Sequence, residues 1–505
     1  MALQHFDVLI MGAGLSGIGA AHHLQKLCPK KSYVILEQRG RIGGTWDLFR
    51  YPGIRSDSDM LTMGYSFRPW TSSQAISGGE EIRNYITDTA HDEGIDRHIR
   101  FQHKILRAAW SSQDATWTVE AVRQSSGGRD EPVTLTCNFL FSCAGYYRYS
   151  AGYTPDFPEV GRFTGRIVHP QAWPEDLDYA GKRVIVIGSG ATAVTLLPAM
   201  AKTAGHVTML QRSPTYFISL PRQDAILTRL RLVLPAMWAY RLSRWKNLAL
   251  MICIYQLARR CPSFVKAGLL KQVREALGPD FDVATHFTPR YDPWTQRLCL
   301  VPDGDLFQAI RAGRASVVTD EIARFTEKGI LLNTGKELEA DIVVTATGLV
   351  MQAFGGVELW VDGCRVDPGR TLAYKGVMMS GVPNFASVFG YINASWTLKA
   401  DLICAYVCRL LNLMARKGAR QVTPRSLDQT AAAPFVESFT PGYIARALAS
   451  WPKQGFRSPW RVYQNYIRDT ISLKWSPVDG GALEFSNPPK GSPAAVAGEF
   501  AQIVK

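Results

Sequence analysis

The sequence predicts an α/β fold with two Rossmann-like dinucleotide-binding domains and a helical insertion. Two glycine-rich turns, at Gly12 and Gly188, each follow an apolar stretch with β-branched residues and precede an apolar stretch of helical pattern. This order of strand, tight turn and helix is typical of domains that bind the pyrophosphate of a dinucleotide. Residues 222–290 differ in composition, are rich in Leu, Ala and Arg, and predict helices.

The length of 505 residues predicts two or three domains, because one core rarely organises so long a chain. The expected parts are a discontinuous first domain (1–145 and 336–477), a second domain (146–221 and 291–335), the helical insertion (222–290) and a C-terminal tail (478–505). The tail is expected to be loose because it is rich in Pro, Gly and Ala.

The composition indicates a folded, cytoplasmic protein. The nine cysteines include no CxxC pair and no metal-ligand spacing, which favours reduced thiols and predicts no metal site. The first strand follows Met1 almost directly, without a signal-peptide pattern, and no apolar run approaches the ~20 residues of a membrane span. The net charge of +14 comes without a zinc-finger, RRM or basic-zipper signature, so nucleic acid is not an expected partner.

The first turn reads GAGLSG and gives each glycine a separate task. Gly12 makes the tight turn, Gly14 lets a pyrophosphate approach the backbone beside Ser16, and Gly17 lets helix and strand pack closely. The next apolar strand ends in Glu37, twenty residues after Gly17, where an acid can hold the hydroxyl groups of a ribose. This spacing predicts a dinucleotide site without a 2′-phosphate.

The second turn reads GSGATA and has Ala193 in place of the third glycine, a substitution that such turns permit. The strand that follows its helix leads into Arg212, nineteen residues after Ala193. A guanidinium at this place can grip a 2′-phosphate through charge-assisted hydrogen bonds. The second turn therefore predicts NADPH, with contacts from Gly188, Ser189, Gly190, Ala191, Thr192, Arg212 and Ser213.

A further glycine-rich segment, GRIGGTWDLFRYPGIRSDSDM, spans residues 40–60. Its paired glycines, Gly43 and Gly44, permit close approach of the backbone to a ligand, and Trp46 offers a flat apolar face to a ring system. Composition alone leaves open whether the segment contacts a cofactor or is an ordinary loop with a buried Trp.

The segment FTGRIVHPQAWP lies between the two turns and fits the pattern FxGxxxHxxxWP at Phe163, Gly165, His169, Trp173 and Pro174. This pattern is the fingerprint of the type I Baeyer–Villiger monooxygenases, which the chain resembles from residue 6 to about residue 467. Stretches such as VTMLQRSPTY and NASWTLKADL are most similar to the ethionamide-activating subgroup of that family. Flavin monooxygenases that oxidise nitrogen and sulfur carry Phe or Tyr at the place of Trp173 and lack Pro174.

The resemblance implies FAD at the first turn, NADPH at the second, and O2-dependent conversion of ketones into esters or lactones, together with oxidation of thioethers. It implies that Arg297 lies over the flavin and stabilises negative charge, and that Asp57 lies beside the flavin and orients Arg297. The turn of Arg55, Ser56 and Asp57 is expected to meet the nicotinamide cofactor. Further flavin contacts are expected from Gly44, Thr45, Trp46, Asp47, Leu48 and Ile105.

Two other functions stay open at this point. One is a flavin monooxygenase that acts only on soft nucleophiles such as sulfides and amines. The other is a protein without catalysis that binds NADPH or a membrane surface. A flavin disulfide reductase is disfavoured, because it needs a redox cysteine pair and the sequence has none.

The basic charge is concentrated between Arg222 and Glu275, where eleven Lys or Arg residues stand against two acidic residues. A basic amphipathic face of this kind can contact the inner face of an anionic membrane. It can also be the solvated side of helices that cover the active site, which is the reading that the sequence favours. The sequence gives no oligomeric state.

Overall fold

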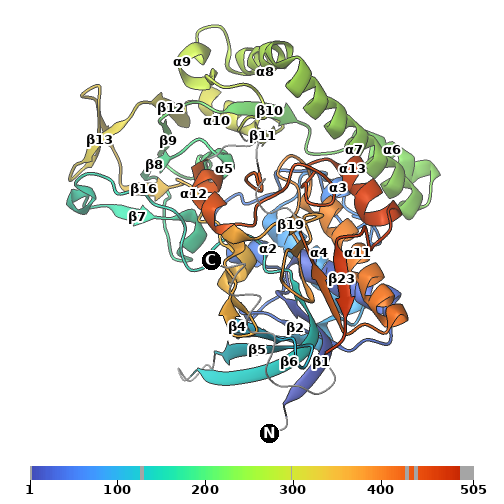
Figure 1. The fold of residues 1–505 in the computed structure, drawn as a ribbon. Helices are drawn as coiled ribbons and strands as arrows, with labels where there is room; N and C mark the ends of the chain where they lie inside the picture. Colours follow the sequence, from blue (N-terminus) through green and yellow to red (C-terminus); the bar gives the residue numbers. More distant parts are fainter. Residues whose placement is uncertain (1–2, 125–129, 297, 427–431, 437–441, 489–505) are drawn as a thin grey trace.

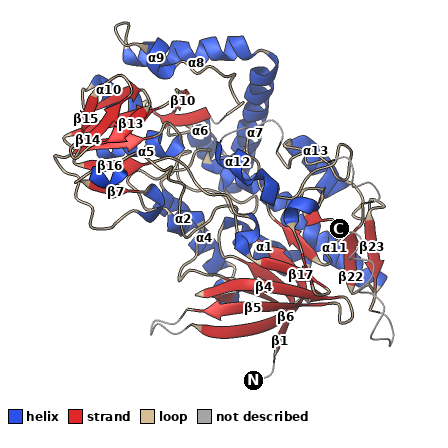
Figure 2. Ribbon diagram, turned by 60° about the vertical axis from the view of Figure 1, so that its left-hand side comes forward, coloured by secondary structure: helices blue, strands red, loops and turns tan. Residues whose placement is uncertain are grey.

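The computed structural model describes residues 3–124, 130–296, 298–426, 432–436 and 442–488. Two separate sheets, each with a parallel core, carry two domains, and long helices run along one side of the molecule (Figures 1 and 2). The predicted α/β class with two dinucleotide-binding folds is confirmed.

In the first sheet, β1 (Gln4–Met11) lies between β6 (Glu131–Ser142) and β2 (Tyr33–Leu36). The strands parallel to β1 and its neighbours are β2, β3 (Ile99–Arg100), β6 and β21 (Phe385–Ser387). An antiparallel extension consists of β4 (His103–Ser111), β5 (Thr116–Arg123), β17 (Glu358–Val361) and β18 (Cys364–Arg365), with β17 parallel to β4. The helices of this domain are α1 (Leu15–Leu27), α2 (Thr45–Leu48), α3 (Met60–Met63), α4 (Gly79–Asp92) and α11 (Trp396–Lys417). Apolar residues of α1, α4 and α11 form one core with β1 and β6.

The second sheet is entirely parallel, in the order β12-β9-β8-β16-β7. Its strands are β7 (Arg166–Val168), β8 (Arg183–Ile187), β9 (His206–Gln211), β12 (Ala315–Thr319) and β16 (Ile342–Thr345), accompanied by α5 (Ala191–Met200) and α10 (Asp305–Arg311). Smaller pairings join β10 (Tyr216–Leu220) to β11 (Leu298–Pro302), and β13 (Ile322–Phe325), β14 (Gly329–Leu332) and β15 (Glu337–Glu339) to one another.

The expected domain boundary at residue 336 is wrong. β15 still pairs with β14, and β16 lies between β7 and β8 in the second sheet. The first later strand of the first sheet is β17. The chain therefore returns to the first domain only after β16, because the apolar IVVT stretch completes the parallel core of the second sheet.

The helical insertion does not behave as one unit. Its helices are α6 (Ala225–Val233), α7 (Ala236–Arg260), α8 (Pro262–Leu277) and α9 (Val283–Phe287). Leu227 of α6 and Tyr240 of α7 are buried in the core of the first domain, whereas Val273 of α8 and Phe287 of α9 belong to the core of the second. The two long helices, α7 and α8, meet at a bend of 113°, so the insertion bridges both domains.

The C-terminal segment, which composition predicted to be a loose tail, contains a strand. β23 (Leu483–Ser486) forms an antiparallel pair with β22 (Gln421–Pro424), so residues 483–486 belong to the fold. Residues 489–505 lie outside the described part of the chain. The remaining elements are β19 (Ala373–Tyr374), β20 (Met378–Met379), α12 (Gly442–Ala447) and α13 (Tyr466–Thr470).

Gly17→Ala should destabilise the first domain. A Cβ at Gly17 would overlap the carbonyl oxygen of Gly12, so α1 would have to move away from β1. Overpacking of this kind costs about 1–3 kcal/mol, which thermal unfolding followed by circular dichroism should detect. The matched control is Gly268→Ala in α8, where a Cβ meets nothing within 4 Å. This substitution should stabilise the helix slightly. Equal unfolding temperatures of the two variants would contradict this reading of the turn.

Candidate active site

A cavity of about 520 Å³ lies where the two domains meet. It is bounded by the first glycine turn, the segment 43–58, the first residues of α5 and two connections between the domains. The predicted cofactor residues that line it are Gly12, Gly14, Ser16, Glu37, Gly44, Thr45, Trp46, Arg55, Ser56, Asp57, Ile105, Ala191 and Thr192. Most of the residues predicted from separate parts of the sequence are thus brought together in one cavity.

The first glycine turn has the geometry of a phosphate cradle. Gly12 has φ +98°, a region that favours glycine, and its amide donates a hydrogen bond of 2.8 Å to the carbonyl of Leu36. The turn leads into the N-terminus of α1, where unpaired amide groups and the helix dipole favour an anion. Gly14 lies close to the backbone of Gly44, since a Cβ at Gly14 would be 3.5 Å from the Cα of Gly44.

Glu37 fixes the far side of this cradle. Its two carboxylate oxygens accept hydrogen bonds of 2.8 Å from the amides of Ala13 and Arg39. Burial raises the pKa of Glu37, although these two amides oppose the rise. The carboxylate lines the cavity while it also holds the turn, so the residue fits both a structural task and the expected contact with ribose.

Three predicted contacts of the first domain do not line the cavity. Gly17 lies at the packing contact between α1 and β1. Asp47 is buried and forms ion pairs with Arg39 at 2.7 Å and Arg50 at 3.4 Å. Leu48 packs against the core of the second domain. Gly17 thus supports the first turn, and Asp47 and Leu48 support the loop, rather than the wall of the cavity.

The loop of Arg55, Ser56 and Asp57 is held between the domains. Arg55 forms an ion pair with Asp305 at the start of α10, in the second domain. The amide of Ser56 donates a hydrogen bond of 2.9 Å to the carbonyl of Ser77, and the amide of Ser77 donates one of 3.2 Å to the hydroxyl of Ser56. Asp57 follows directly, on the cavity wall.

Arg297, the predicted catalytic residue, lies outside the described residues. The strand β11 begins directly after it, and Leu300 of β11 lines the cavity.

The second glycine turn repeats the geometry of the first. Gly188 has φ +131°, and its amide donates a hydrogen bond of 2.8 Å to the carbonyl of Leu210. The hydroxyl of Ser189 donates to the carbonyl of Ser213 at 3.1 Å, which brings the turn beside the segment that carries the exposed Arg212. Gly188, Ser189, Gly190, Arg212 and Ser213 do not line the cavity itself. They flank the start of α5, and the α5 residues Ala191 and Thr192 line the cavity.

The two connections between the domains run side by side. The amide of Arg148 donates to the carbonyl of Val350 at 2.8 Å, and the amide of Gln352 donates to the carbonyl of Tyr146 at 3.0 Å. The side-chain amide of Gln171 donates to the carbonyl of Arg148 at 2.7 Å. Both connections line the cavity, through residues that include Tyr146 and Gln352.

None of the fingerprint residues lines the cavity. His169 contacts the connections, whereas Phe163, Gly165 and Trp173 pack within the second domain. Phe163 is buried in a core beside Phe325, and a Cβ at Gly165 would meet the carbonyl of Asp341. Trp173 contacts Tyr179 edge to face beside the core of the second domain, with Pro174 following it. The ring of His169 occupies the space that a side chain at Gly152 would need. Within the motif, His169 therefore joins the second domain to the connections between the domains.

His169 is held in one neutral tautomer. Nδ1 accepts a hydrogen bond of 3.1 Å from the amide of Gln171, so Nε2 carries the proton that it donates to the carbonyl of Gly348 at 3.2 Å. Burial lowers the pKa of His169, against the opposing effect of the carbonyls of Gly348 and Tyr153. A second proton would have to enter at Nδ1 and break the bond to Gln171.

Several aromatic residues of the cavity were missed by the sequence reasoning. The indole of Trp396 donates a hydrogen bond of 2.8 Å to the hydroxyl of Ser16 and stacks on Tyr146, with ring centroids 4.9 Å apart. Tyr149 lines the cavity beside Thr45, and burial raises its pKa to about 12. Trp396 comes from the start of α11, about 380 residues after Ser16, and no local spacing signals such a contact.

Tyr391 is a further wall residue that was missed. Its hydroxyl donates to Asp469 at 2.8 Å, and Asp469 forms an ion pair of 3.2 Å with Lys399; both ionic side chains are buried. Burial raises the pKa of Asp469, and the charge of Lys399 opposes the rise. The pair connects the wall of the cavity to the C-terminal segment.

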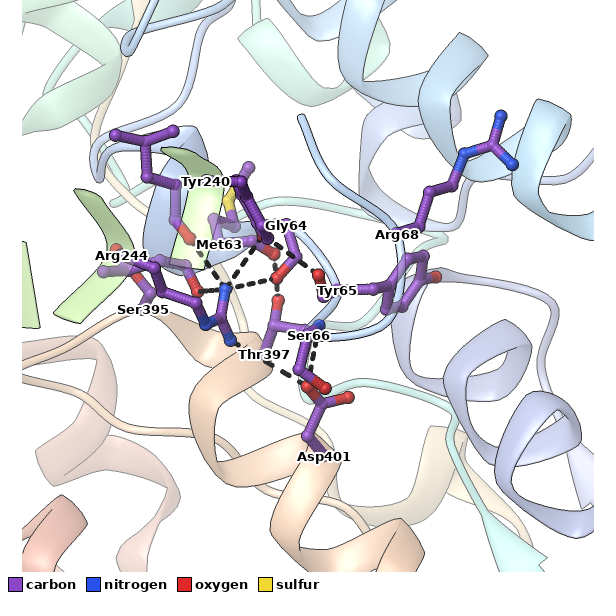
Figure 3. A network of polar contacts seen from close by, with 12 residues as sticks. Met63, Gly64, Tyr65, Ser66, Arg68, Tyr240, Arg244, Ser395, Thr397 and Asp401 are labelled. Atoms are coloured by element: carbon purple, nitrogen blue, oxygen red, sulfur yellow. Dashed lines mark hydrogen bonds and ion pairs between the residues drawn. The ribbon is translucent and has the colours of Figure 1, made fainter. Parts of the chain in front are cut away.

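A second buried network attaches α7 to the first domain (Figure 3). The guanidinium of Arg244 donates hydrogen bonds to the carbonyls of Leu61, Thr62 and Gly64, at 2.7, 3.1 and 2.7 Å. It also lies 3.9 Å from the carboxylate of Asp401 in α11. Of the residues that the structure describes, none between 222 and 290 lines the cavity.

One phosphate-cradling turn lines the cavity, and a second leads into α5, whose first residues line it too; this arrangement defines a protein that binds two dinucleotides together. The sequence model of flavin-binding monooxygenase-like proteins matches residues 75–380, and that of an NAD(P)-binding Rossmann-like domain matches residues 10–70. The chain belongs to the flavin-binding monooxygenase-like family.

The chain is 53% identical over 485 residues to the FAD-containing monooxygenase EthA of Mycolicibacterium smegmatis, covering 96% of this chain and 97% of that protein. It is 49% identical over 485 residues to the probable FAD-binding monooxygenase AlmA of Acinetobacter baylyi, covering 95% and 96%. The predicted flavin-dependent monooxygenase is confirmed, and the predicted cofactors FAD and NADPH agree with these relatives.

Solved structures share the fold. An oxidised steroid monooxygenase bound to NADP has a TM-score of 0.74 at 22% identity, covering 96% of this chain and 100% of that one. The closed structure of cyclohexanone monooxygenase has a TM-score of 0.74 at 20% identity, with the same coverage.

The stability of the linkers should depend on pH through His169. Because its pKa is lower in the folded than in the unfolded protein, its contribution is complete above the usual value of roughly 6.5 and is lost as pH falls below it. The unfolding temperature of wild type should therefore fall more between pH 7.5 and 5.5 than that of His169→Gln, because glutamine cannot take up the proton. Parallel curves of unfolding temperature against pH would show that His169 is not involved.

Proposed function

We propose that this protein is a type I Baeyer–Villiger monooxygenase that converts ketones into esters or lactones with FAD, NADPH and O2, and that also oxidises thioethers at sulfur. The observation that carries the proposal is that residues of the first turn and the first residues of α5 line the same cavity. Two dinucleotides held there would have their reactive ends within one enclosure. The complete fingerprint and the FAD-containing relatives at about half identity support the proposal.

FAD, when bound, supplies electron transfer from NADPH to O2 and delivery of one oxygen atom to the substrate. The chain contributes binding and orientation. The first turn and the N-terminus of α1 would hold the pyrophosphate of FAD, and Glu37 would hold its ribose. The second turn would hold the pyrophosphate of NADPH, while Arg212 and Ser213 would hold the 2′-phosphate.

Arg297 and Asp57 are the proposed catalytic residues. Asp57 and Leu300 both line the cavity, so the two segments that carry the proposed pair reach the same space. The guanidinium of Arg297 would stabilise negative charge that develops on the reacting oxygen atoms, and Asp57 would orient it. The aromatic walls formed by Trp46, Trp396 and Tyr146 would exclude water, which strengthens this interaction.

The proposed setting is the cytoplasm, where NADPH is available, with a peripheral contact to the anionic inner face of the membrane. No single helix among the described residues is long and apolar enough to cross a membrane; α7 and α8 pass that test only as a bent pair. The contact is therefore proposed at the surface of the bilayer.

Arg297→Ala should keep FAD and its reduction by NADPH but lose about 100- to 1000-fold in ester formation, the usual cost of one preorganised stabilising group. Product identification with a cyclic ketone and a thioether tests both the residue and the reaction. The matched control is Arg290→Ala, an exposed arginine in the same segment. Ester formed at the wild-type rate would remove Arg297 from the mechanism. If the wild-type enzyme oxidises only the thioether, the protein is a flavin monooxygenase that acts on soft nucleophiles. If the purified protein contains no flavin, the alternative of a protein without catalysis is supported.

Arg212→Ala should weaken NADPH far more than NADH, because only NADPH has the 2′-phosphate. A charge-assisted hydrogen bond of roughly 1.5–3 kcal/mol corresponds to a change in preference of about 10- to 150-fold. Steady-state KM values for both cofactors measure it, with Lys202→Ala as a control for loss of one exposed positive charge. An equal loss for both cofactors would place the phosphate elsewhere.

A further inference from the structure

The outward side of α7 is apolar. Trp238, Leu242, Trp245 and Leu257 have exposed fractions of 58%, 48%, 63% and 42%. Together with the exposed Ala249 and Cys253 they recur every three or four residues, which places them on one face of a helix. The stripe runs for about 29 Å at 1.5 Å per residue.

The stripe continues into the end of α6. Leu232 and Val233 have exposed fractions of 83% and 76% and precede α7 by only a few residues. We call these two residues, with Trp238, Leu242, Trp245 and Leu257, the α7 face. A single exposed apolar residue needs no explanation, whereas a continuous row of large ones indicates a surface that something covers.

The charge around the α7 face selects its partner. α7 contains no Asp or Glu in its 25 residues. Arg241 is exposed between the apolar positions and lies 5.9 Å from the ring of Trp238, and Arg259 and Arg260 end the helix. A second copy of this chain would bring like charges together, since each copy carries +14. An anionic surface is complementary.

The side chains of the α7 face also fit a lipid surface in particular. Tryptophan is enriched at the boundary between lipid tails and headgroups, and arginine binds anionic headgroups beside it. Because α7 alone is too polar to cross a bilayer, its axis would lie in the plane of the interface.

The opposite side of α7 is rigidly fixed, so the face is preformed. Arg244 is bonded to three carbonyls between Leu61 and Gly64 (Figure 3), and the side-chain amide of Asn247 donates to Asp59 at 3.0 Å. Asp59 belongs to the same loop as Asp57 and Ser58 of the cavity wall. Binding would therefore need no new ordering of the helix, which lowers its entropic cost.

We propose that the α7 face docks the holoenzyme on an anionic lipid surface, with α7 parallel to the membrane plane. The inference rests on the membrane contact proposed above and deepens it by naming the surface that makes the contact. The purpose of docking would be to bring the cavity to apolar substrates dissolved in lipid. The docking itself is measured without catalysis.

Co-sedimentation of the holoenzyme with vesicles tests the proposal. Wild type should pellet with vesicles of phosphatidylcholine and phosphatidylglycerol, and little of it should pellet with phosphatidylcholine alone. Less should pellet with the mixed vesicles in roughly 1 M salt, because charges are then screened within about 3 Å. The double variant Trp238→Ala/Trp245→Ala should lose about tenfold or more in apparent affinity. The matched control is Leu27→Ser, an equally simple loss of an exposed apolar side chain at the end of α1.

Wild type that stays in the supernatant with anionic vesicles would overturn the proposal, as would equal binding of wild type and the double variant. Self-association that the double variant abolishes, without vesicle binding, would assign the face to a second copy. Ketone oxidation should be unchanged in the double variant when the substrate is water-soluble. Vesicle binding without any ketone oxidation would thus reject the proposed function and leave the docking intact.

Discussion

The pairing of the two connections between the domains is the constraint on which the site depends. Residues near Tyr146 and Gln352 exchange backbone hydrogen bonds, so the chain leaves the first domain and returns to it at one place. The same residues form part of the cavity wall. His169 and Gln171 attach the pair to the second domain through the carbonyls of Gly348 and Arg148. His169, which does not line the cavity, therefore helps to hold the connections that form part of the cavity wall.

The parts of the proposed site that can be recognised from sequence are those formed by neighbours in the chain. A tight turn before a helix requires glycine, so Gly12 and Gly188 could be recognised together with the helix start that each precedes. A carboxylate in a glycine-rich loop, such as Asp47, can face a ligand or a nearby arginine, and only packing shows its ion pairs with Arg39 and Arg50. Trp396 and Tyr391 were missed because their partners, Ser16 and Asp469, lie far away in the chain.

The errors in domain organisation have a similar cause. A short buried strand such as IVVT is apolar on both sides, and its composition does not tell which of two parallel sheets it completes. β23 was assigned to a loose tail because its partner, β22, is some sixty residues away. The basic stretch was recognised by counting charge, whereas the division of α7 into a buried face and an exposed face required the packing of Tyr240 and Leu248 against the first domain.

The paired connections also bear on how the protein folds. Along the chain, the segment between Tyr153 and Thr347 interrupts the first domain. The two ends of this segment are neighbours, because the hydroxyl of Thr347 donates a hydrogen bond to the carbonyl of Tyr153. The entropy lost in closing a loop grows only slowly with its length, so a long insert with adjacent ends is a small burden on the host. The inserted domain has a parallel sheet and a core of its own. Its assembly can precede that of the interrupted host, whose central sheet must wait for β17 and β21 from the far end of the chain.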